Sequence, residues 1–430
     1  MRILLYFEFL MKRQSFFFLF LILFGLDRVV LAQRPGSGLS QSFLKNQNKS
    51  HNSLIYNYLY KNGDSLTHQL LNDPDQWGIQ IVYTRVKKKG NRARDFQDHF
   101  FNVDKGRYFY PASTVKFPIA ILALQRLREL AIPGLDRNST FITEKDRDLQ
   151  TEVFNDPTTP DGRPTIAHYI KKILLVSDND AYNRLYEWLG QDYINASLHR
   201  LGYDNVEIVH RLSLPLSVEE NRYTNPVLFF DTLGNLLHRQ DGRFALHEAR
   251  PMTIKMGKGY ISRGKLVGEP FDFSYKNRLP LPDLHHMIRQ VMFPSSVPAS
   301  RRFLLTQEDR DFLRDYMSRL PSQSRYPSYD STTIWDNYVK FLYYGSSQEK
   351  PDDSIRIYNK VGNAYGFLID AACIEERRSG KKFMLSAVIY CNSDGIFNDD
   401  IYDYDRVGFP FLKTLGQALY RASFSDRSFQ

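Results

Sequence analysis

The chain has 430 residues, 42% of them hydrophobic and 24% charged, and these fractions are typical of a folded globular protein and exclude wholesale disorder. Its formal net charge of +9 suits an anionic cell envelope, but this charge does not by itself indicate nucleic acid, so we expect no nucleic-acid partner. The two cysteines, Cys373 and Cys391, are too few for a disulfide framework or a four-cysteine zinc site.

The first 32 residues have the pattern of a secretory signal. Lys12 and Arg13 precede an apolar run over residues 16–26, and Ala32 ends a small-residue cleavage site. A membrane anchor is the alternative, but the run is shorter than the about 20 residues that span a bilayer. We therefore predict cleavage after Ala32 and a periplasmic or secreted protein, translated from the first residue or from Met11.

The next part of the chain predicts a pair of strands followed by helices. Residues 77–86 are β-rich and partly alternating, and residues 95–110 can supply the strand that returns from the basic turn at 85–94. Residues 113–130 carry a broad apolar face, which is typical of a buried helix. Further helices are predicted at 166–176, 181–189 and 224–237.

The stretch at about 239–302 differs from its surroundings because it is rich in Gly, Pro and basic residues and has weak periodicity. We interpret it as an insertion, either a lid over a site or a partner surface. A helix at 305–320 follows, with Thr306 as its N-cap and acidic residues in its first turn. The last predicted elements are strands at 355–361, 365–374 and 382–391 and a helix at 406–422.

This order of strands, helices, strands and helix predicts an α+β fold. Strands from both chain ends most simply share one antiparallel sheet flanked by helices, and the central helices form an all-helical lobe. We predict a signal peptide at 1–32, a linker and N-terminal helix at 33–70, and one catalytic domain at 71–425 that includes the insertion. We expect a monomer.

The two cysteines lie on the two strands of the last predicted hairpin. With the turn near Ser379, Cys373 and Cys391 are offset by about six residues, roughly 20 Å along the strands. A disulfide requires Cα atoms within about 7 Å. We therefore predict two free, buried thiols.

Ser113 and Lys116 form the first pattern with chemical meaning. Serine and lysine three residues apart on a helix lie on one face, so the amine can take the hydroxyl proton if burial lowers its pKa. Free N–H groups at the helix start can also stabilise an oxyanion. Taken alone, the pattern is equally typical of a serine that caps a helix.

Two further patterns follow in the chain. Ser177-Asp178-Asn179 lies at the junction of two predicted helices, where a serine can relay a proton and an asparagine can bind an amide; by itself it is also typical of a helix cap. Lys360-Val361-Gly362 lies on a predicted strand, where Gly362 permits close approach of a backbone or substrate. A solvated strand lysine is the alternative for Lys360.

Together, SxxK, SDN and KxG in this order resemble the motif set of the penicillin-recognising serine acyltransferases, most closely the class A β-lactamases. The resemblance covers residues 75–235 and 303–422, including the segment that begins at Thr224 and the helix expected after it. It implies the β-lactamase/transpeptidase-like fold, a serine hydrolase, no metal and no cofactor.

The resemblance also implies a role for each matching residue. Ser113 would be the acylated nucleophile, Lys116 its base, and Ser177 the proton donor to the leaving nitrogen. The substrate-binding residues would be Asn179, Lys360, Gly362 and Asn363, with the oxyanion held by the backbone N–H groups of Ser113 and Asn363.

Two departures from the family's pattern affect the predicted activity. Val361 replaces a hydroxyl residue, and no glutamate directly follows Arg211, so only Glu219 and Glu220 remain as candidates for the base that activates water for deacylation. Our leading hypothesis is β-lactamase-like amide hydrolysis through an acyl-enzyme on Ser113. The alternatives are a penicillin-binding cell-wall peptidase or esterase with slow deacylation, or a non-catalytic binding module. The expected substrate is a β-lactam or a peptidoglycan-like amide.

Overall fold

The computed structural model describes residues 54–89, 93–250 and 252–424. The predicted signal peptide, its cleavage site and residues 33–53 of the predicted linker lie outside these ranges. None of the helices within the described ranges combines the length and the apolar character needed to cross a bilayer.

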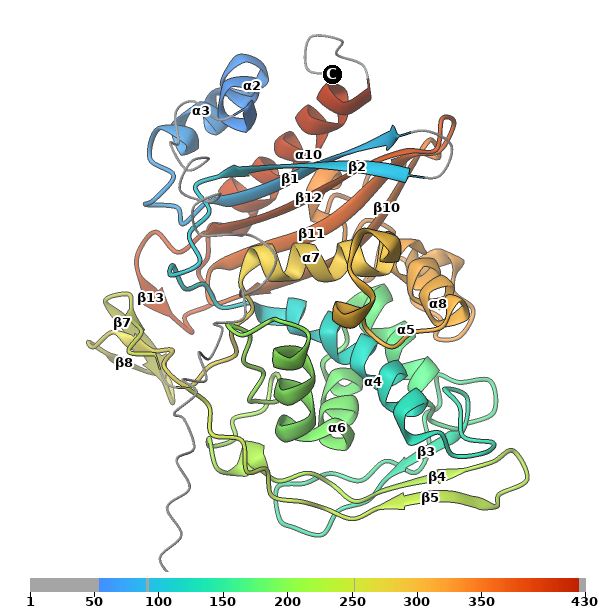
Figure 1. The fold of residues 1–430 in the computed structure, drawn as a ribbon. Coiled ribbons are helices and arrows are strands. Elements are labelled where there is room, and N and C mark those ends of the chain that lie inside the picture. The colour runs from blue at the N-terminus through green and yellow to red at the C-terminus, as the bar shows by residue number, and fades with distance from the viewer. Residues whose placement is uncertain (1–53, 90–92, 251, 425–430) are drawn as a thin grey trace, which may run out of the picture. The chain divides into compact units, whose positions relative to one another are not determined.

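The described chain follows the predicted order of strands, helices, strands and helix (Figure 1). The helices are α2 Leu54–Asn62, α3 Ser65–Asn72, α4 Lys116–Leu130, α5 Ile166–Val176, α6 Asn179–Arg200, α7 Leu281–Met292, α8 Gln307–Ser318, α9 Phe341–Tyr344 and α10 Phe409–Phe424. The strands are β1 Gln80–Lys89, β2 Ala93–Phe101, β3 Thr140–Thr143, β4 Val227–Phe230, β5 Leu236–Gln240, β6 Lys255–Met256, β7 Gly259–Ser262, β8 Lys265–Val267, β9 Phe271–Asp272, β10 Ile355–Ala364, β11 Phe367–Glu376, β12 Lys381–Tyr390 and β13 Ile396–Phe397.

The main sheet has five antiparallel strands in the order β10-β11-β12-β1-β2, so strands from both ends of the chain are hydrogen-bonded neighbours. This arrangement confirms the predicted α+β fold. Side chains alternate between the two faces of a strand, and on β1 Val82 belongs to one hydrophobic cluster while Ile81 and Tyr83 belong to another. Helix α7 packs on one face, against β1, β11 and β12, and α10 and α2 cover the other (Figure 1).

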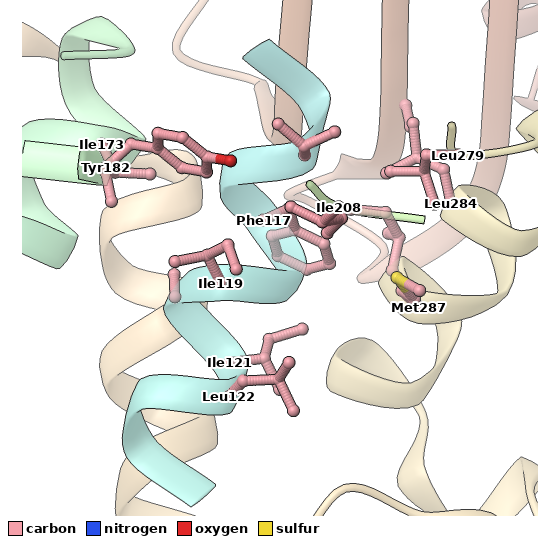
Figure 2. Close-up of a cluster of buried hydrophobic side chains, with 14 of the residues drawn as sticks. Phe117, Ile119, Ile121, Leu122, Ile173, Tyr182, Ile208, Leu279, Leu284 and Met287 are labelled. Atoms are coloured by element: carbon pink, nitrogen blue, oxygen red, sulfur yellow. The ribbon is translucent and has the colours of Figure 1, made fainter. Parts of the chain in front are cut away.

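The helical lobe is built around α4, which is buried along most of its length. Helices α5 and α6 pack against it. Figure 2 shows the side chains that meet there, from α4 in the centre, α5 and α6 on one side and the α7 region on the other: Phe117, Ile119, Ile121, Leu122, Ile173, Tyr182, Ile208, Leu279, Leu284 and Met287. This packing holds the start of α4 beneath the edge strand β10.

The prediction of a helix at 224–237 is wrong. These residues form β4 and β5, and β4 pairs with both β3 and β5. The Asp231 carboxylate accepts the backbone N–H groups of Leu233 and Asn235 and so closes the turn between the strands. The spacing of the apolar residues matched a helical period. However, Asp231 and Gly234 favour a turn, and the β-branched and aromatic residues of β4 favour a strand, so the segment forms a hairpin.

Two other helices differ from their predicted bounds. The helix expected to end at Leu189 continues as α6 to Arg200, with a break at Gly190, whose φ of 73° is not helical. Helix α7 lies within the stretch interpreted as an insertion, and its buried residues pack on the main sheet. The sequence did not indicate this helix because Pro280 and Pro282 lie at its start, although proline is well tolerated in the first turn of a helix.

Neither cysteine forms a disulfide, and both are buried, as predicted. The hairpin register pairs Cys373 with Met384, and Tyr390, the neighbour of Cys391, with Phe367. The cap of α8 is also confirmed, because the Thr306 side chain accepts the backbone N–H of Asp309 in a capping box.

Candidate active site

The predicted nucleophile lies where the chain enters the helical lobe. Ser113 is half-buried in a 3₁₀ turn, Ala112–Val115, that leads directly into α4. Ala112 has a φ of 47°, a conformation that non-glycine residues adopt rarely and mostly at functional sites. One turn later, Lys116 begins α4 and is fully buried. The sequence pattern therefore places a partly accessible hydroxyl beside a buried amine.

The Lys116 amine donates hydrogen bonds to the Ser177-Asp178-Asn179 segment. Its Nζ lies 2.6 Å from Asn179 Oδ1 and 3.3 Å from Ser177 Oγ, and it also donates to the Ser177 carbonyl oxygen. Ser177 ends α5 in the left-handed conformation, with φ 62° and ψ 39°. Asp178 then caps α6 by accepting the Ala181 N–H at 2.8 Å. The junction between two helices thus directs both motif side chains at Lys116.

Lys360 approaches the same hydroxyl from the sheet. It lies on β10 and is buried, and its Nζ donates to Ser177 Oγ at 2.7 Å and to the Val361 carbonyl oxygen at 2.8 Å. Ser177 Oγ therefore accepts hydrogen bonds from two lysine amines, Lys116 on α4 and Lys360 on β10. The three sequence motifs meet at this single atom.

Gly362 lets β10 come close to the nucleophile segment. A Cβ atom at Gly362 would lie 2.8 Å from the Pro111 carbonyl oxygen and 3.0 Å from the backbone nitrogens of Ser113 and Thr114. Contacts this short do not occur for real side chains, so only glycine fits here. Asn363 follows on β10 with an exposed side chain, and the close approach brings its backbone next to Ser113.

Burial lowers the pKa of Lys116 to about 7, and the nearby Asp178 carboxylate opposes that shift. Burial also holds the pKa of Lys360 well below its usual range, helped by the positive charges of Lys116 and Lys340 and opposed by Asp370. Charged amines crowded into a desolvated site favour loss of a proton. A lysine that is neutral near pH 7 can accept the proton of a serine hydroxyl.

A buried polar network behind β10 was not anticipated. The Lys340 Nζ donates to Asn359 Oδ1 at 2.7 Å, and Asn359 Nδ2 donates to Asp370 Oδ1 at 2.8 Å. Asp370 Oδ2 also accepts the backbone N–H groups of Phe341 and Leu342. These side chains lie on separate segments with no shared sequence pattern, so the sequence offered no signal for their meeting. The network fixes Asn359, the neighbour of Lys360.

The loop after Arg211 brings an unexpected residue to the site. The Ser213 Oγ accepts a hydrogen bond from Asn179 Nδ2 at 2.8 Å. The loop is anchored by a buried ion pair, in which Arg211 Nε lies 2.8 Å from Glu187 Oε1 on α6. The only signal in the sequence for Ser213 was its place in the loop after Arg211, where no glutamate directly follows the arginine.

The two glutamates considered as deacylation bases have different surroundings from one another. Glu219 is exposed, and Glu220 faces Arg147, with 3.7 Å between its Oε1 and the guanidinium. Within the described residues, neither has a hydrogen bond or ion pair to Lys116, Ser177 or Asn179. The described residues also contain no group of three or more His, Cys, Asp and Glu side chains that could hold a metal ion.

The chain was compared with known proteins. The model of a family described as Beta-lactamase enzyme family matches residues 80–421. Among solved structures, the chain is similar to a class A β-lactamase from Clostridium kluyveri, with 15% identity, a TM-score of 0.47 and coverage of 84% of this chain and 99% of that one. It is also similar to a β-lactamase from Sphaerobacter thermophilus, with 12% identity, a TM-score of 0.45 and coverage of 83% of this chain and 96% of that one. A protein named PBP-A is similar with 14% identity, a TM-score of 0.45 and coverage of 86% of this chain and 96% of that one. No curated protein matches the chain.

The contact at Gly362 leads to a first prediction. Gly362→Ala forces β10 and the 3₁₀ turn apart, and overpacking of this kind costs about 1–3 kcal/mol in the free energy of unfolding. Urea denaturation measures the loss. Gly268→Ala is the control, because nothing lies within 4 Å of a Cβ at that position. Equal stability of the two variants would contradict the close approach.

Proposed function

Because the chain belongs to the beta-lactamase enzyme family, we propose that it is a secreted serine hydrolase that forms an acyl-enzyme on Ser113 and releases the acyl group slowly. The observation that carries this proposal is the convergence of Lys116 and Lys360 on Ser177 Oγ beside the nucleophile turn. The substrate class is an amide of the β-lactam or peptidoglycan type. Family membership agrees with the resemblance inferred from the motifs.

Acylation begins when Ser113 Oγ attacks the amide carbonyl carbon while neutral Lys116 takes the hydroxyl proton. The carbonyl oxygen becomes an oxyanion, which the backbone N–H groups of Ser113 and Asn363 stabilise. Collapse of this intermediate breaks the C–N bond, and Ser177 gives its proton to the leaving nitrogen. The hydrogen bonds from Lys116 and Lys360 to Ser177 Oγ support this relay, since each lysine can return a proton to the hydroxyl.

Deacylation needs a base to activate water, and the residue next to Asn179 is Ser213, whose hydroxyl has too high a pKa for that task. The carboxylate of Glu220 faces Arg147 instead. We therefore infer that the acyl-enzyme forms readily and hydrolyses slowly, as in a penicillin-binding peptidase. Efficient β-lactam turnover is not expected.

The place of action follows from the amino-terminal pattern. A charged start, an apolar run and a small-residue site at Ala32 favour export to the periplasm or the medium. The net positive charge favours association with the anionic cell envelope. We propose that the mature protein acts there as a monomer.

Covalent labelling tests the proposed nucleophile. A fluorescent penicillin is expected to label the mature chain at one site, and Ser113→Ala should abolish the label because Ser177, whose hydroxyl lies 3.3 Å from Lys116 Nζ, serves as the proton relay and not as the nucleophile. Ser379→Ala, in the exposed turn between β11 and β12, is the control and should label fully. Absence of label on the wild type, or equal label on Ser113→Ala, would contradict the proposal.

The rate of labelling should depend on pH through Lys116. With a pKa of about 7, its amine is neutral above pH 7 and can act as the base, and it is protonated below. The second-order rate constant for acylation should therefore fall about tenfold per pH unit below pH 7 and level off above it. Stopped-flow labelling measures this profile. A rate that stays constant down to about pH 5 would rule out Lys116 as the titrating base.

Slow deacylation is tested by restoring a carboxylate beside Asn179. Ser213→Glu should increase the rate of deacylation by about a hundredfold, the lower end of what one positioned general base contributes. In Ser213→Gln the new side chain has a size similar to that of glutamate but no charge, so deacylation of this variant should remain slow. Mass spectrometry of the acyl-enzyme over time separates acylation from deacylation. Equal lifetimes of the Glu and Gln acyl-enzymes would count against a missing base as the cause.

A further inference from the structure

A cavity of about 560 Å³ lies between the loop that carries Ser213 and the segment around 247–276. The loop contributes an aliphatic wall that includes Leu214, Leu216 and Val218. Leu214 and Val218 are 44% and 54% exposed and therefore offer apolar surface to a ligand in the cavity. The segment around 247–276 contributes most of the charged groups of the opposite wall.

The charge at the inner side of the cavity is Lys276. Its side chain is half-buried, and this burial lowers its pKa. None of the ion pairs within the described residues includes Lys276; its Nζ lies 5.8 Å from the centre of the Phe271 ring. A cation removed from water without a counter-ion is unfavourable. A carboxylate in the cavity would supply the missing counter-ion.

His210 adds a hydrogen-bond acceptor to the same wall. Its Nδ1 lies 2.6 Å from the Arg211 carbonyl oxygen, and because a carbonyl only accepts, Nδ1 carries the proton. Nε2 is then a bare acceptor, buried without a hydrogen-bond partner among the described residues. Burial lowers the pKa of His210 to about 4, so the ring is neutral at pH 7. It therefore adds no positive charge beside Lys276.

The rim of the cavity carries the opposite charge. Asp272 and Glu248 are exposed carboxylates that line it. Two other charged side chains of the lining already have partners. The Arg222 guanidinium lies 4.2 Å above the Phe244 ring, and His247 lies 2.7 Å from Glu207. The cavity thus offers a cation inside and carboxylates at its mouth.

The cavity is close to the nucleophile segment. The His210 ring is parallel to the ring of Tyr110, with 6.0 Å between their centres, and Tyr110 meets Tyr365 edge-on at 5.0 Å. Tyr110 lies three residues before Ser113, and Tyr365 two residues after Asn363. These ring contacts link the wall of the cavity to the segments that carry Ser113 and Asn363, and Leu214, next to Ser213, lines the cavity directly.

We propose that this cavity is a subsite for an anionic side chain on the acyl donor, with the side-chain carboxylate bound at Lys276. The aliphatic stem of the donor's side chain lies against Leu214 and Val218. The inference rests on the proposed acylation of Ser113 and names the kind of side chain that this acyl site prefers.

Two cephalosporins with the same ring system test the subsite. Cephalosporin C carries a zwitterionic D-α-aminoadipyl side chain, and cephalothin carries a neutral thienylacetyl group. Acylation rate constants are measured for both by mass spectrometry. Lys276→Gln should lower the constant for cephalosporin C about fivefold or more and leave that for cephalothin unchanged, which also shows that the variant is folded. Lys276→Arg should keep most of the preference.

A further probe isolates the carboxylate. The adipyl analogue of cephalosporin C keeps the side-chain carboxylate without the ammonium group and should show the same dependence on Lys276. Lys258→Gln changes an exposed lysine of the same segment outside the cavity and should have no effect. A ratio of cephalosporin C to cephalothin that is the same in wild type and Lys276→Gln would overturn the subsite.

Calorimetric titration with free D-α-aminoadipate distinguishes failure of the subsite from failure of the proposed function. If neither cephalosporin acylates Ser113, the proposed function fails, and the titration still decides the subsite. Saturable binding to the wild type that weakens about fivefold or more in Lys276→Gln, with Lys258→Gln unchanged, supports it. No binding, or equal binding to wild type and Lys276→Gln, overturns it.

Discussion

The site depends on two buried lysines that share one hydroxyl. Lys116 comes from α4 and Lys360 from β10, and both donate to Ser177 Oγ. Two ammonium groups this close, both out of water, repel one another, and the free energy of the site falls when one of them loses its proton. The repulsion between the two buried ammonium groups therefore favours a neutral lysine, which can act as a base. The helical lobe and the sheet must therefore meet at a fixed distance.

That distance is set from both sides. On the lobe side, the buried face of α4 is packed by α5 and α6, so the 3₁₀ turn that carries Ser113 cannot shift freely (Figure 2). On the sheet side, Asp370 joins β11 to the backbone of α9 and, through Asn359, to the strand of Lys360. Its negative charge also offsets part of the positive charge of Lys360. Gly362 then allows the two surfaces to touch.

The loop after Arg211 and the segment around 247–276 line the cavity beside the site. The buried pair between Arg211 and Glu187 holds the loop on α6, so its exposed part can change without loss of the anchor. Ser213 in this loop contacts the catalytic cluster, and Leu214 next to it lines the neighbouring cavity. In the proposed function, this one loop therefore affects both the lifetime of the acyl-enzyme and the binding of the acyl group's side chain.

The sequence by itself determined the elements and the motifs whose meaning is local. A buried helix just after Ser113, a lysine one turn after that serine, a cap at Thr306 and alternating strands follow from short-range sterics and hydrogen bonding, and the structure has them. Even the absence of a disulfide followed from strand register. Where local signals conflicted, at 224–237, the spacing of apolar residues was misleading, because turn chemistry and pairing with β3 outweigh helical periodicity. Only the tertiary structure decided that Asn179 faces Ser213 rather than a glutamate, and that Lys276 lies half-buried without a carboxylate, because burial and partner choice depend on segments far apart in the chain.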